Sequence, residues 1–188
     1  MKSFVKIFTF FLISGFAMQV FAQKANERAS EGSFGKSALY KQIASTLVET
    51  SGNIASAPRL EKLAKSKYVL VYHSAHWCPP CRQFTPKFVQ FYEDHQKNAS
   101  QAFEAIFVSL DNSIEEQKKY MKEAKMPWLA VKYEQARKSE LMQFAGRGIP
   151  CLVLLDENGS VLANSYHGDQ YLGPNHVLKE FEKLLSKH

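Results

Sequence analysis

The stretch that decides the fold is WCPPC at residues 77–81, preceded by YVLVY at residues 68–72 and followed by RQFTPKFVQFYEDHQ at residues 82–96. The first flank is a near-continuous apolar run, which is typical of a strand covered on both faces. The second flank has apolar residues at helical spacing and predicts an amphipathic helix. Cys78 and Cys81, three positions apart, can close a small disulfide ring and open it again. A dithiol at a strand-to-helix junction indicates thiol–disulfide exchange chemistry.

Strands and helices alternate along the chain beyond this stretch. Strands are predicted at residues 105–110, 151–155 and 161–163, and helices over residues 113–126, 136–144 and 174–185. A turn with the sequence DENG, at residues 156–159, makes the last two strands antiparallel. We therefore expect an α/β fold in which a central mixed β-sheet is flanked by helices on both faces.

The segment from residue 37 to residue 66 allows two interpretations. Residues 47–54 could form a hairpin, whereas apolar residues at every fourth position from 39 to 47 could line one face of a helix. The pattern does not decide between them. Pro58 and the leucines after it predict a short helix.

The first 22 residues have the features of a signal peptide. Lys2 and Lys6 form a basic start, residues 7–20 are apolar, and Ala22 ends a pattern that favours cleavage after it. An uncleaved N-terminal anchor is the alternative, although the uncharged stretch is short for a membrane span. We therefore expect an exported protein, periplasmic in a bacterium with two membranes.

Composition limits the classes of partner and the role of the cysteines. The formal net charge is +6 at pH 7 with the charges interspersed, so we infer no nucleic-acid partner. Three cysteines leave one outside a single disulfide, which favours a redox pair plus one extra thiol over a structural disulfide framework. The extra thiol, Cys151, is expected to be a small buried hydrophobe, and a third redox thiol is the alternative.

Together these residues resemble the thioredoxin superfamily, and within it the tryparedoxin and nucleoredoxin branch and bacterial exported thioredoxin-like proteins. The matching segments are SAHWCPPCR at residues 74–82, FTP at 84–86, FVSLD at 107–111, MPWL at 126–129 and RGIP at 147–150. The resemblance implies the thioredoxin fold. Together with the leader and the polar composition that follows it, the resemblance divides the chain into a signal peptide at residues 1–22, a polar linker at 23–40 and a thioredoxin-like domain at 41–188.

The resemblance also implies roles for residues around the dithiol. It implies a cis peptide bond between Ile149 and Pro150 that faces the cysteine pair. Trp77 is expected to be a partly exposed lid and a surface for substrate. Many thioredoxins carry a buried Asp where this chain has Tyr72, so proton transfer through a carboxylate at this position is not expected. We hypothesise that water or the Tyr72 hydroxyl transfers the proton instead.

The chemistry of the pair follows from its place at the start of a helix. Cys78 is the expected nucleophile because free N–H groups and the helix dipole stabilise its thiolate. Cys81, one turn further, is the expected resolving thiol. Pro79 and Pro80 carry no N–H, so thiolate stabilisation is moderate and the couple is reducing.

These residues predict an exported thiol–disulfide oxidoreductase that works as a reductase through a mixed disulfide. It needs no cofactor of its own, acts on a protein or small disulfide, works as a monomer and draws electrons from a membrane donor, because its compartment is oxidising. The alternative is a copper- or zinc-binding module, or metallochaperone, in which His73 and His76 join the dithiol. A peroxidase is less favoured, because a peroxidatic cysteine needs no partner three positions away.

Overall fold

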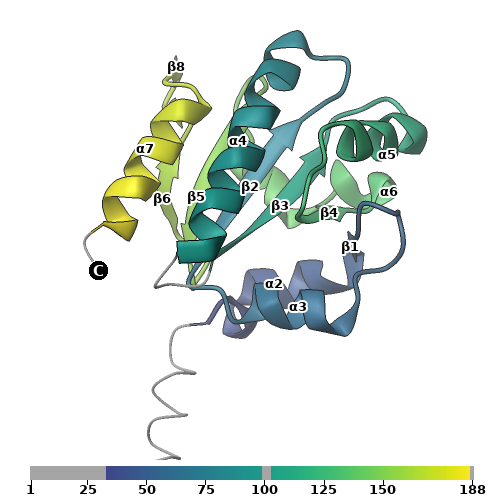
Figure 1. Ribbon diagram of the computed structural model, residues 1–188, viewed down its shortest axis with the longest axis horizontal. Helices are drawn as coiled ribbons and strands as arrows, with labels where there is room; N and C mark the ends of the chain where they lie inside the picture. Colours follow the sequence, from purple (N-terminus) through teal and green to yellow (C-terminus); the bar gives the residue numbers. More distant parts are fainter. Residues whose placement is uncertain (1–32, 99–102, 187–188) are drawn as a thin grey trace, which may run out of the picture. The chain divides into compact units, whose positions relative to one another are not determined.

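The computed structural model describes residues 33–98 and 103–186, and its centre is a six-stranded mixed sheet (Figure 1). The strand order is β1-β4-β3-β2-β5-β6. The strands are β1 (Leu47–Val48), β2 (Tyr68–Ser74), β3 (Phe103–Ser109), β4 (Leu129–Val131), β5 (Cys151–Asp156) and β6 (Val161–Asn164). Strand β2 pairs in parallel with β3 and antiparallel with β5, so the mixed sheet is confirmed.

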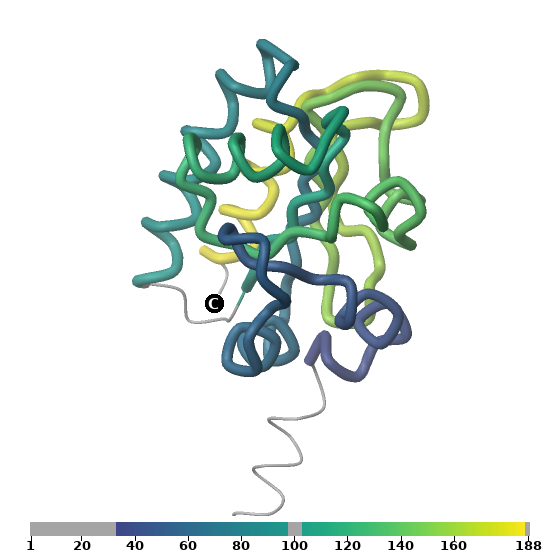
Figure 2. Tube along the Cα trace, turned by 90° about the vertical axis from the view of Figure 1, so that its right-hand side faces the viewer, coloured from purple at the N-terminus to yellow at the C-terminus, as the bar shows by residue number. Residues whose placement is uncertain are grey.

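Helices cover both faces of the sheet. They are α2 (Ala38–Ile43), α3 (Ala57–Ala64), α4 (Pro79–Asn98), α5 (Ile114–Glu123), α6 (Tyr133–Ala136) and α7 (Pro174–Leu185), with 3-10 segments η1 (Phe34–Lys36), η2 (Ala44–Thr46) and η3 (Glu140–Phe144). Apolar residues of α4, α5 and α7 form one core cluster, and those of α2, α3 and α6 belong to a second cluster. Figure 2 shows α4 and the α6–η3 segment on opposite sides of the strands.

Strand β2 lies between β3 and β5 in the sheet and is followed directly by the segment that contains the dithiol. All seven of its residues are buried. Because side chains alternate across a strand, Tyr72 joins the cluster under α4, whereas Val71 joins the cluster on the other face. The strand ends at Ser74, and the chain then enters α4 at Pro79. The carboxyl ends of strands β2 and β3 thus meet beside the cysteines, at the edge where α/β folds place their sites.

Both interpretations of the segment before residue 66 hold in part. Residues 38–43 form helix α2, whereas Val48 makes an antiparallel bridge with Ile54. The turn between them passes through Gly52 at φ +84°, a backbone conformation that favours glycine. The short helix predicted at Pro58 is α3.

Two details differ from the pattern-based prediction. Of the helix expected over residues 136–144, Ala136 is the last residue of α6, and residues 140–144 form the separate 3-10 segment η3, because the Ser139 side chain accepts a hydrogen bond from the Leu141 N–H and starts a new turn. Strand β4 and a small hairpin of β7 (Tyr166–His167) and β8 (Gln170–Tyr171) had no prediction. These elements have two or three residues each, too few to show a period.

The structure describes only part of the N-terminal segment for which predictions were made. The leader at residues 1–22 lies outside the described residues. The stretch expected to be a linker is helical in its last part, in η1 and α2, and Phe34 there is fully buried, so the packed fold begins before residue 41. Within residues 33–98 and 103–186, no helix combines the length and apolarity that a membrane crossing requires.

Candidate active site

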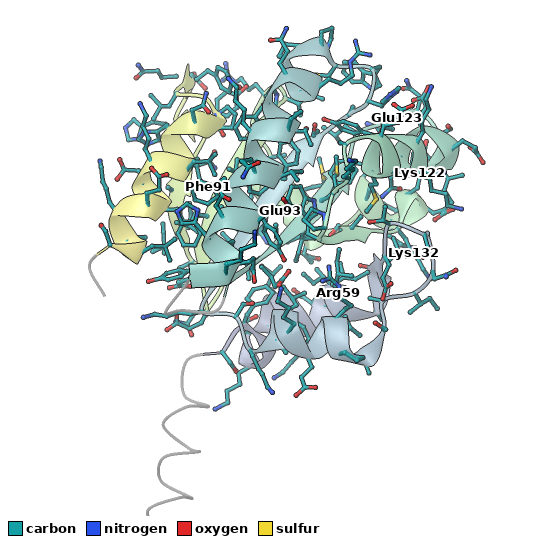
Figure 3. All side chains as sticks on the ribbon, in the orientation of Figure 1. Arg59, Phe91, Glu93, Lys122, Glu123 and Lys132 are labelled. Carbon is teal, nitrogen blue, oxygen red and sulfur yellow. A yellow bond between two sulfur atoms is a disulfide. The ribbon has the colours of Figure 1, made fainter. Side chains whose placement is uncertain are left out.

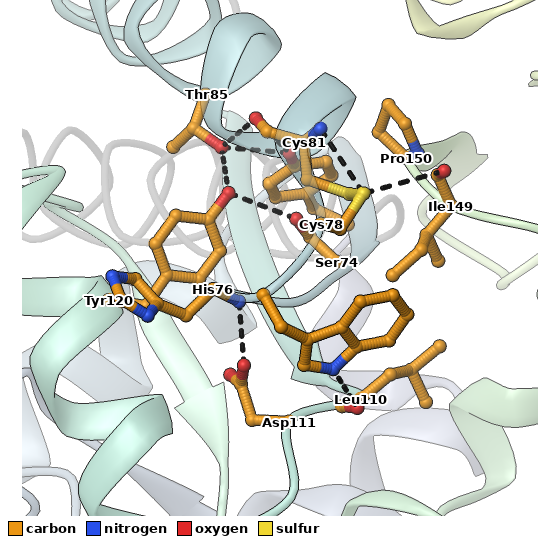
Figure 4. The surroundings of a disulfide bond; sticks show 12 residues. Ser74, His76, Cys78, Cys81, Thr85, Leu110, Asp111, Tyr120, Ile149 and Pro150 are labelled. Carbon is orange, nitrogen blue, oxygen red and sulfur yellow. Dashed lines mark hydrogen bonds between the residues drawn. A yellow bond between two sulfur atoms is a disulfide. The ribbon is translucent and has the colours of Figure 1, made fainter.

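Cys78 and Cys81 form a disulfide at the start of α4, with their Cα atoms 5.3 Å apart (Figure 4). The Cys78 N–H donates to the Ala75 carbonyl at 3.2 Å, which closes the turn between β2 and the helix. Cys78 keeps 4% of its surface exposed and Cys81 keeps none. Both cysteines are thus buried in the disulfide form, and Cys78 is the residue of the pair that keeps some exposed surface.

Because Pro79 and Pro80 carry no N–H, few backbone donors are expected near the Cys78 sulfur, and the structure agrees. The Cys81 N–H donates to Cys78 Sγ at 3.3 Å. Across from it, Cys78 Sγ lies 3.7 Å from the Ile149 carbonyl oxygen. The peptide bond between Ile149 and Pro150 is cis, as expected. The structure thus brings the cysteine pair and the Ile-Pro segment together from distant parts of the chain.

The loop before Cys78 is anchored to residues that follow β3. Trp77 is 52% exposed, and its indole N–H donates to the Leu110 carbonyl at 3.2 Å. The His76 N–H donates to Asp111 Oδ1 at 2.6 Å, and the Ser109 hydroxyl donates to Asp111 Oδ2 at 2.7 Å. Burial raises the pKa of the Asp111 carboxyl above its usual value. Asp111 had no predicted role, although it lies in a segment that carried the resemblance.

A cluster of buried hydroxyl groups lies behind Cys81. The Thr85 hydroxyl donates to the Cys81 carbonyl at 2.9 Å and lies 2.8 Å from the Tyr72 hydroxyl. Tyr120 Oη lies 2.5 Å from Thr85 Oγ1 and 3.1 Å from Ser74 Oγ (Figure 4). Burial raises the pKa of Tyr72 well above its ordinary value, so this hydroxyl stays protonated. It lies 3.5 Å from the carbonyl oxygen of Cys81 and is a hydrogen-bond donor to the backbone there.

The structure does not bring the two histidines to the dithiol. His73 is buried, and its Nε2 hydrogen donates to the Leu141 carbonyl at 3.0 Å. Burial lowers the pKa of His73 to about 4, so the ring is neutral near pH 7. His76 Nε2 instead lies 3.0 Å from Glu123 Oε2 of α5, which Figure 3 labels. Among the described residues, no three His, Cys, Asp or Glu side chains are grouped to hold a metal ion.

Cys151 is buried, as expected of a small apolar residue. It packs in the cluster that contains Val71 and Val153. Burial raises the pKa of its thiol, which keeps it protonated and unreactive.

A cavity of about 240 Å³ opens beside the dithiol. Trp77 and Ile149 line it, and they connect it to Cys78, because Trp77 precedes Cys78 and the Ile149 carbonyl oxygen lies 3.7 Å from Cys78 Sγ. Its other lining residues are His73, Leu110, Asn112, Arg137, Ala145, Gly146, Arg147 and Gly148. A reacting disulfide at Cys78 can therefore place its neighbouring residues in this cavity.

Comparison with known proteins identifies thioredoxin-like relatives. A family model described as thioredoxin-like matches residues 66–161. Nucleoredoxin of Mus musculus is 46% identical over 122 residues, covering 64% of this chain but 26% of that protein. The chain thus spans about a quarter of the nucleoredoxin length. Tryparedoxin of Trypanosoma brucei brucei is 34% identical over 128 residues, covering 66% of this chain and 83% of that protein.

Solved structures give the same fold. Tryparedoxin I from Leishmania major superposes with a TM-score of 0.57 at 30% identity, covering 75% of this chain and 88% of that chain. Thioredoxin from Wuchereria bancrofti gives a TM-score of 0.56 at 32% identity, covering 76% of this chain and 97% of that chain. The expected thioredoxin fold is thereby confirmed.

Proposed function

This chain belongs to the thioredoxin-like family of redox proteins, and from that premise we propose that it is an exported thiol–disulfide oxidoreductase that works as a reductase. The observation that carries the proposal is the asymmetry of the two sulfurs. Cys78 retains exposed surface, receives the Cys81 N–H and faces Ile149, whereas Cys81 is fully covered behind it. One sulfur can capture a partner, and the other can displace it.

The proposed reaction proceeds in two displacements. The Cys78 thiolate attacks one sulfur of a substrate disulfide, so that a mixed disulfide forms and the first substrate thiolate leaves and is protonated. Cys81, deprotonated, then attacks Cys78 Sγ, closes the Cys78–Cys81 disulfide and releases the second substrate thiol. Two electrons pass from the dithiol to the substrate.

Neighbouring residues are assigned supporting roles. Trp77 and Ile149 present a surface to the substrate backbone beside the reacting sulfur. Pro150 fixes the Ile149 carbonyl opposite Cys78, and Tyr72 supports the Cys81 backbone through its hydroxyl. Pro79 and Pro80 both lack an N–H, and Pro80 stands where such a donor would reach the thiolate, which keeps the couple reducing.

The setting of the reaction is also part of the proposal. The leader-like residues 1–22 support export, to the periplasm in a bacterium with two membranes, with an uncleaved anchor as the alternative. Residues ahead of the packed fold serve as a linker to the thioredoxin-like domain. A reductase in an oxidising compartment needs its own electron supply, so we assign it a membrane electron donor. Protein or small disulfides are its substrates, and it acts as a monomer.

Trapping tests this function directly. In a Cys81→Ser variant the mixed disulfide cannot be resolved, so exported proteins or small thiols should accumulate on Cys78, identified by mass mapping. The matched control is Cys78→Ser, which should trap nothing. Equal alkylation rates of Cys78 and Cys81 in the folded, reduced protein, or a reduction potential near about −120 mV, typical of strong oxidants, would overturn the proposal.

A further inference from the structure

We propose that the cavity beside Trp77 selects disulfide partners that carry a carboxylate close to the target cysteine. This inference rests on the proposed function and names its substrate class. The cavity adjoins the reacting sulfur, because Ile149 lines it and its carbonyl oxygen lies 3.7 Å from Cys78 Sγ. A group bound there therefore belongs to a residue near the disulfide, not to a remote part of the partner.

The charged side chains that line the cavity are all cationic. Arg137 and Arg147 contribute two cations, and no Asp or Glu is among the lining residues. His73, also in the lining, is neutral near pH 7. The nearby carboxylate of Asp111 is already engaged by the His76 N–H and the Ser109 hydroxyl. An anionic side chain would thus find two guanidinium groups in the lining, where its competitor is Asp169, an acid outside the lining that pairs with Arg147.

Arg137 uses only one of its three guanidinium nitrogens in its hydrogen bonds to backbone carbonyls. Its Nη2 donates to the Leu110 carbonyl at 3.2 Å and to the Asp111 carbonyl at 3.3 Å. Both bonds use the same nitrogen, and Nη1 and Nε have no other partner among the described residues. A guanidinium fixed in this way presents its remaining N–H groups in a rigid plane, which suits a carboxylate.

Arg147, the other cation in the lining, makes an exposed ion pair with Asp169. Its Nη2 lies 2.5 Å from Asp169 Oδ1, and the two side chains are 75% and 76% exposed. Exposed ion pairs contribute little stability, so an incoming carboxylate can replace Asp169. Asp169 lies in the turn of the β7–β8 hairpin, which also positions the loop that carries Arg147.

That loop is fixed by two tyrosines of the hairpin. A β-carbon at Gly146 would overlap the ring of Tyr166, so the absence of a side chain lets the hairpin pack directly on the loop. The Tyr171 hydroxyl donates to the Pro150 carbonyl at 2.9 Å. The backbone that carries Arg147 into the lining of the cavity is therefore held in place.

The test compares three disulfide-linked peptides that differ only in carrying Glu, Gln or Lys beside each cysteine. The pre-reduced full chain is mixed with each peptide, and the single-turnover rate constant for forming the Cys78–Cys81 disulfide is measured. We expect the Glu peptide to react about fivefold faster than the Gln peptide at low salt, with the Lys peptide slowest and the differences shrinking as salt is added.

Three variants assign the preference to the cavity. Arg147→Glu should abolish or reverse the Glu preference, and Asp169→Asn should increase it by removing the competitor. Arg82→Glu is the matched control, because Arg82 is exposed, lies next to Cys81 and does not line the cavity, so the preference should persist.

Equal rates for all three peptides would overturn the inference and leave the proposed function intact. An Arg82→Glu variant that loses the preference as fully as Arg147→Glu would also overturn it, since the overall charge would then be responsible. If no peptide oxidises the dithiol at all, the proposed function itself fails.

Discussion

The backbone N–H of His76 donates to a buried carboxylate oxygen of Asp111, and this bond ties the loop before the dithiol to the segment that follows β3. The Trp77 indole N–H binds the Leu110 carbonyl next to it. Two successive residues of one loop are thus held by two successive residues of another. This arrangement fixes the lid beside Cys78 without using either cysteine.

We predict that Asp111→Ala destabilises the fold by about 1–3 kcal/mol, because the buried N–H of His76 and hydroxyl of Ser109 lose their acceptor. Chemical denaturation measures the loss. Alkylation of reduced Cys78 should change as well, because the loop that carries Trp77 loses its anchor. Asp111→Asn keeps one acceptor oxygen and should recover part of the stability. An Asp111→Ala variant as stable as the parent protein would contradict this role.

Pro80 should set the reduction potential, and Pro79 should not. Cys78 caps α4, and a cap side chain accepts from the N–H groups two and three residues on. Cys81 supplies the second of these at 3.3 Å, whereas Pro80 leaves the first empty. Pro80→Ala restores that donor, lowers the pKa of the Cys78 thiol and should raise the potential by about 30 mV, equivalent to about 1.4 kcal/mol.

Equilibration with a glutathione buffer measures the potential of the proline variants, and thiolate absorbance follows the pKa. Pro79→Ala is the matched control, because its N–H would lie outside the capping pair. A shift of equal size in both variants would show that backbone stiffness, not the missing donor, is responsible.

The Tyr72 hydroxyl should matter for stability more than for turnover. It contacts Thr85 Oγ1 at 2.8 Å and the Cys81 carbonyl oxygen at 3.5 Å. Tyr72→Phe removes about one hydrogen bond and should cost about 1 kcal/mol of unfolding free energy. We expect the reduction rate of a peptide disulfide to change by less than about twofold, since Thr85 still binds the Cys81 carbonyl. A tenfold slower resolving step would instead make the hydroxyl a proton carrier.

His73 should make the fold sensitive to acid. Its pKa in the folded protein is about 4, below its ordinary value of 6.5, so the unfolded chain binds more protons between these pH values. Stability should therefore be lost as pH falls from about 6.5 towards 4, by up to about 3 kcal/mol. His73→Gln keeps a donor for the Leu141 carbonyl without titrating. Its unfolding free energy should fall less steeply over this range, and identical slopes would exclude His73 as the cause.

Much of the fold could be predicted from local pattern. Strands β2, β3 and β5 are long and apolar enough to be recognised in isolation, and so are α4 and α7. Strand β4 has three residues, Leu129–Val131, and is a strand only because it pairs with β1 and β3. The break at Ser139 depends on one side-chain hydrogen bond that competes with a helix, which periodicity cannot show.

The site was predictable where its residues are neighbours in sequence. Cys78, Cys81 and Trp77 form one motif, and the resemblance supplied the cis bond before Pro150. The hydroxyl cluster was not predictable, since Ser74, Thr85 and Tyr120 come from β2, α4 and α5 and meet only after folding. The same holds for Arg137 and Arg147, whose shared cavity depends on the loop after β3 and on the hairpin.

The packing of Tyr166 against Gly146 also restricts how this protein can evolve. A larger residue at position 146 is admissible only if position 166 becomes smaller in the same lineage, because the ring already fills the space. A substitution at either position alone would shift the segment that ends in the Ile149–Pro150 bond. Comparative sequences should therefore show these two positions covarying, even though neither residue belongs to the Cys78–Cys81 pair.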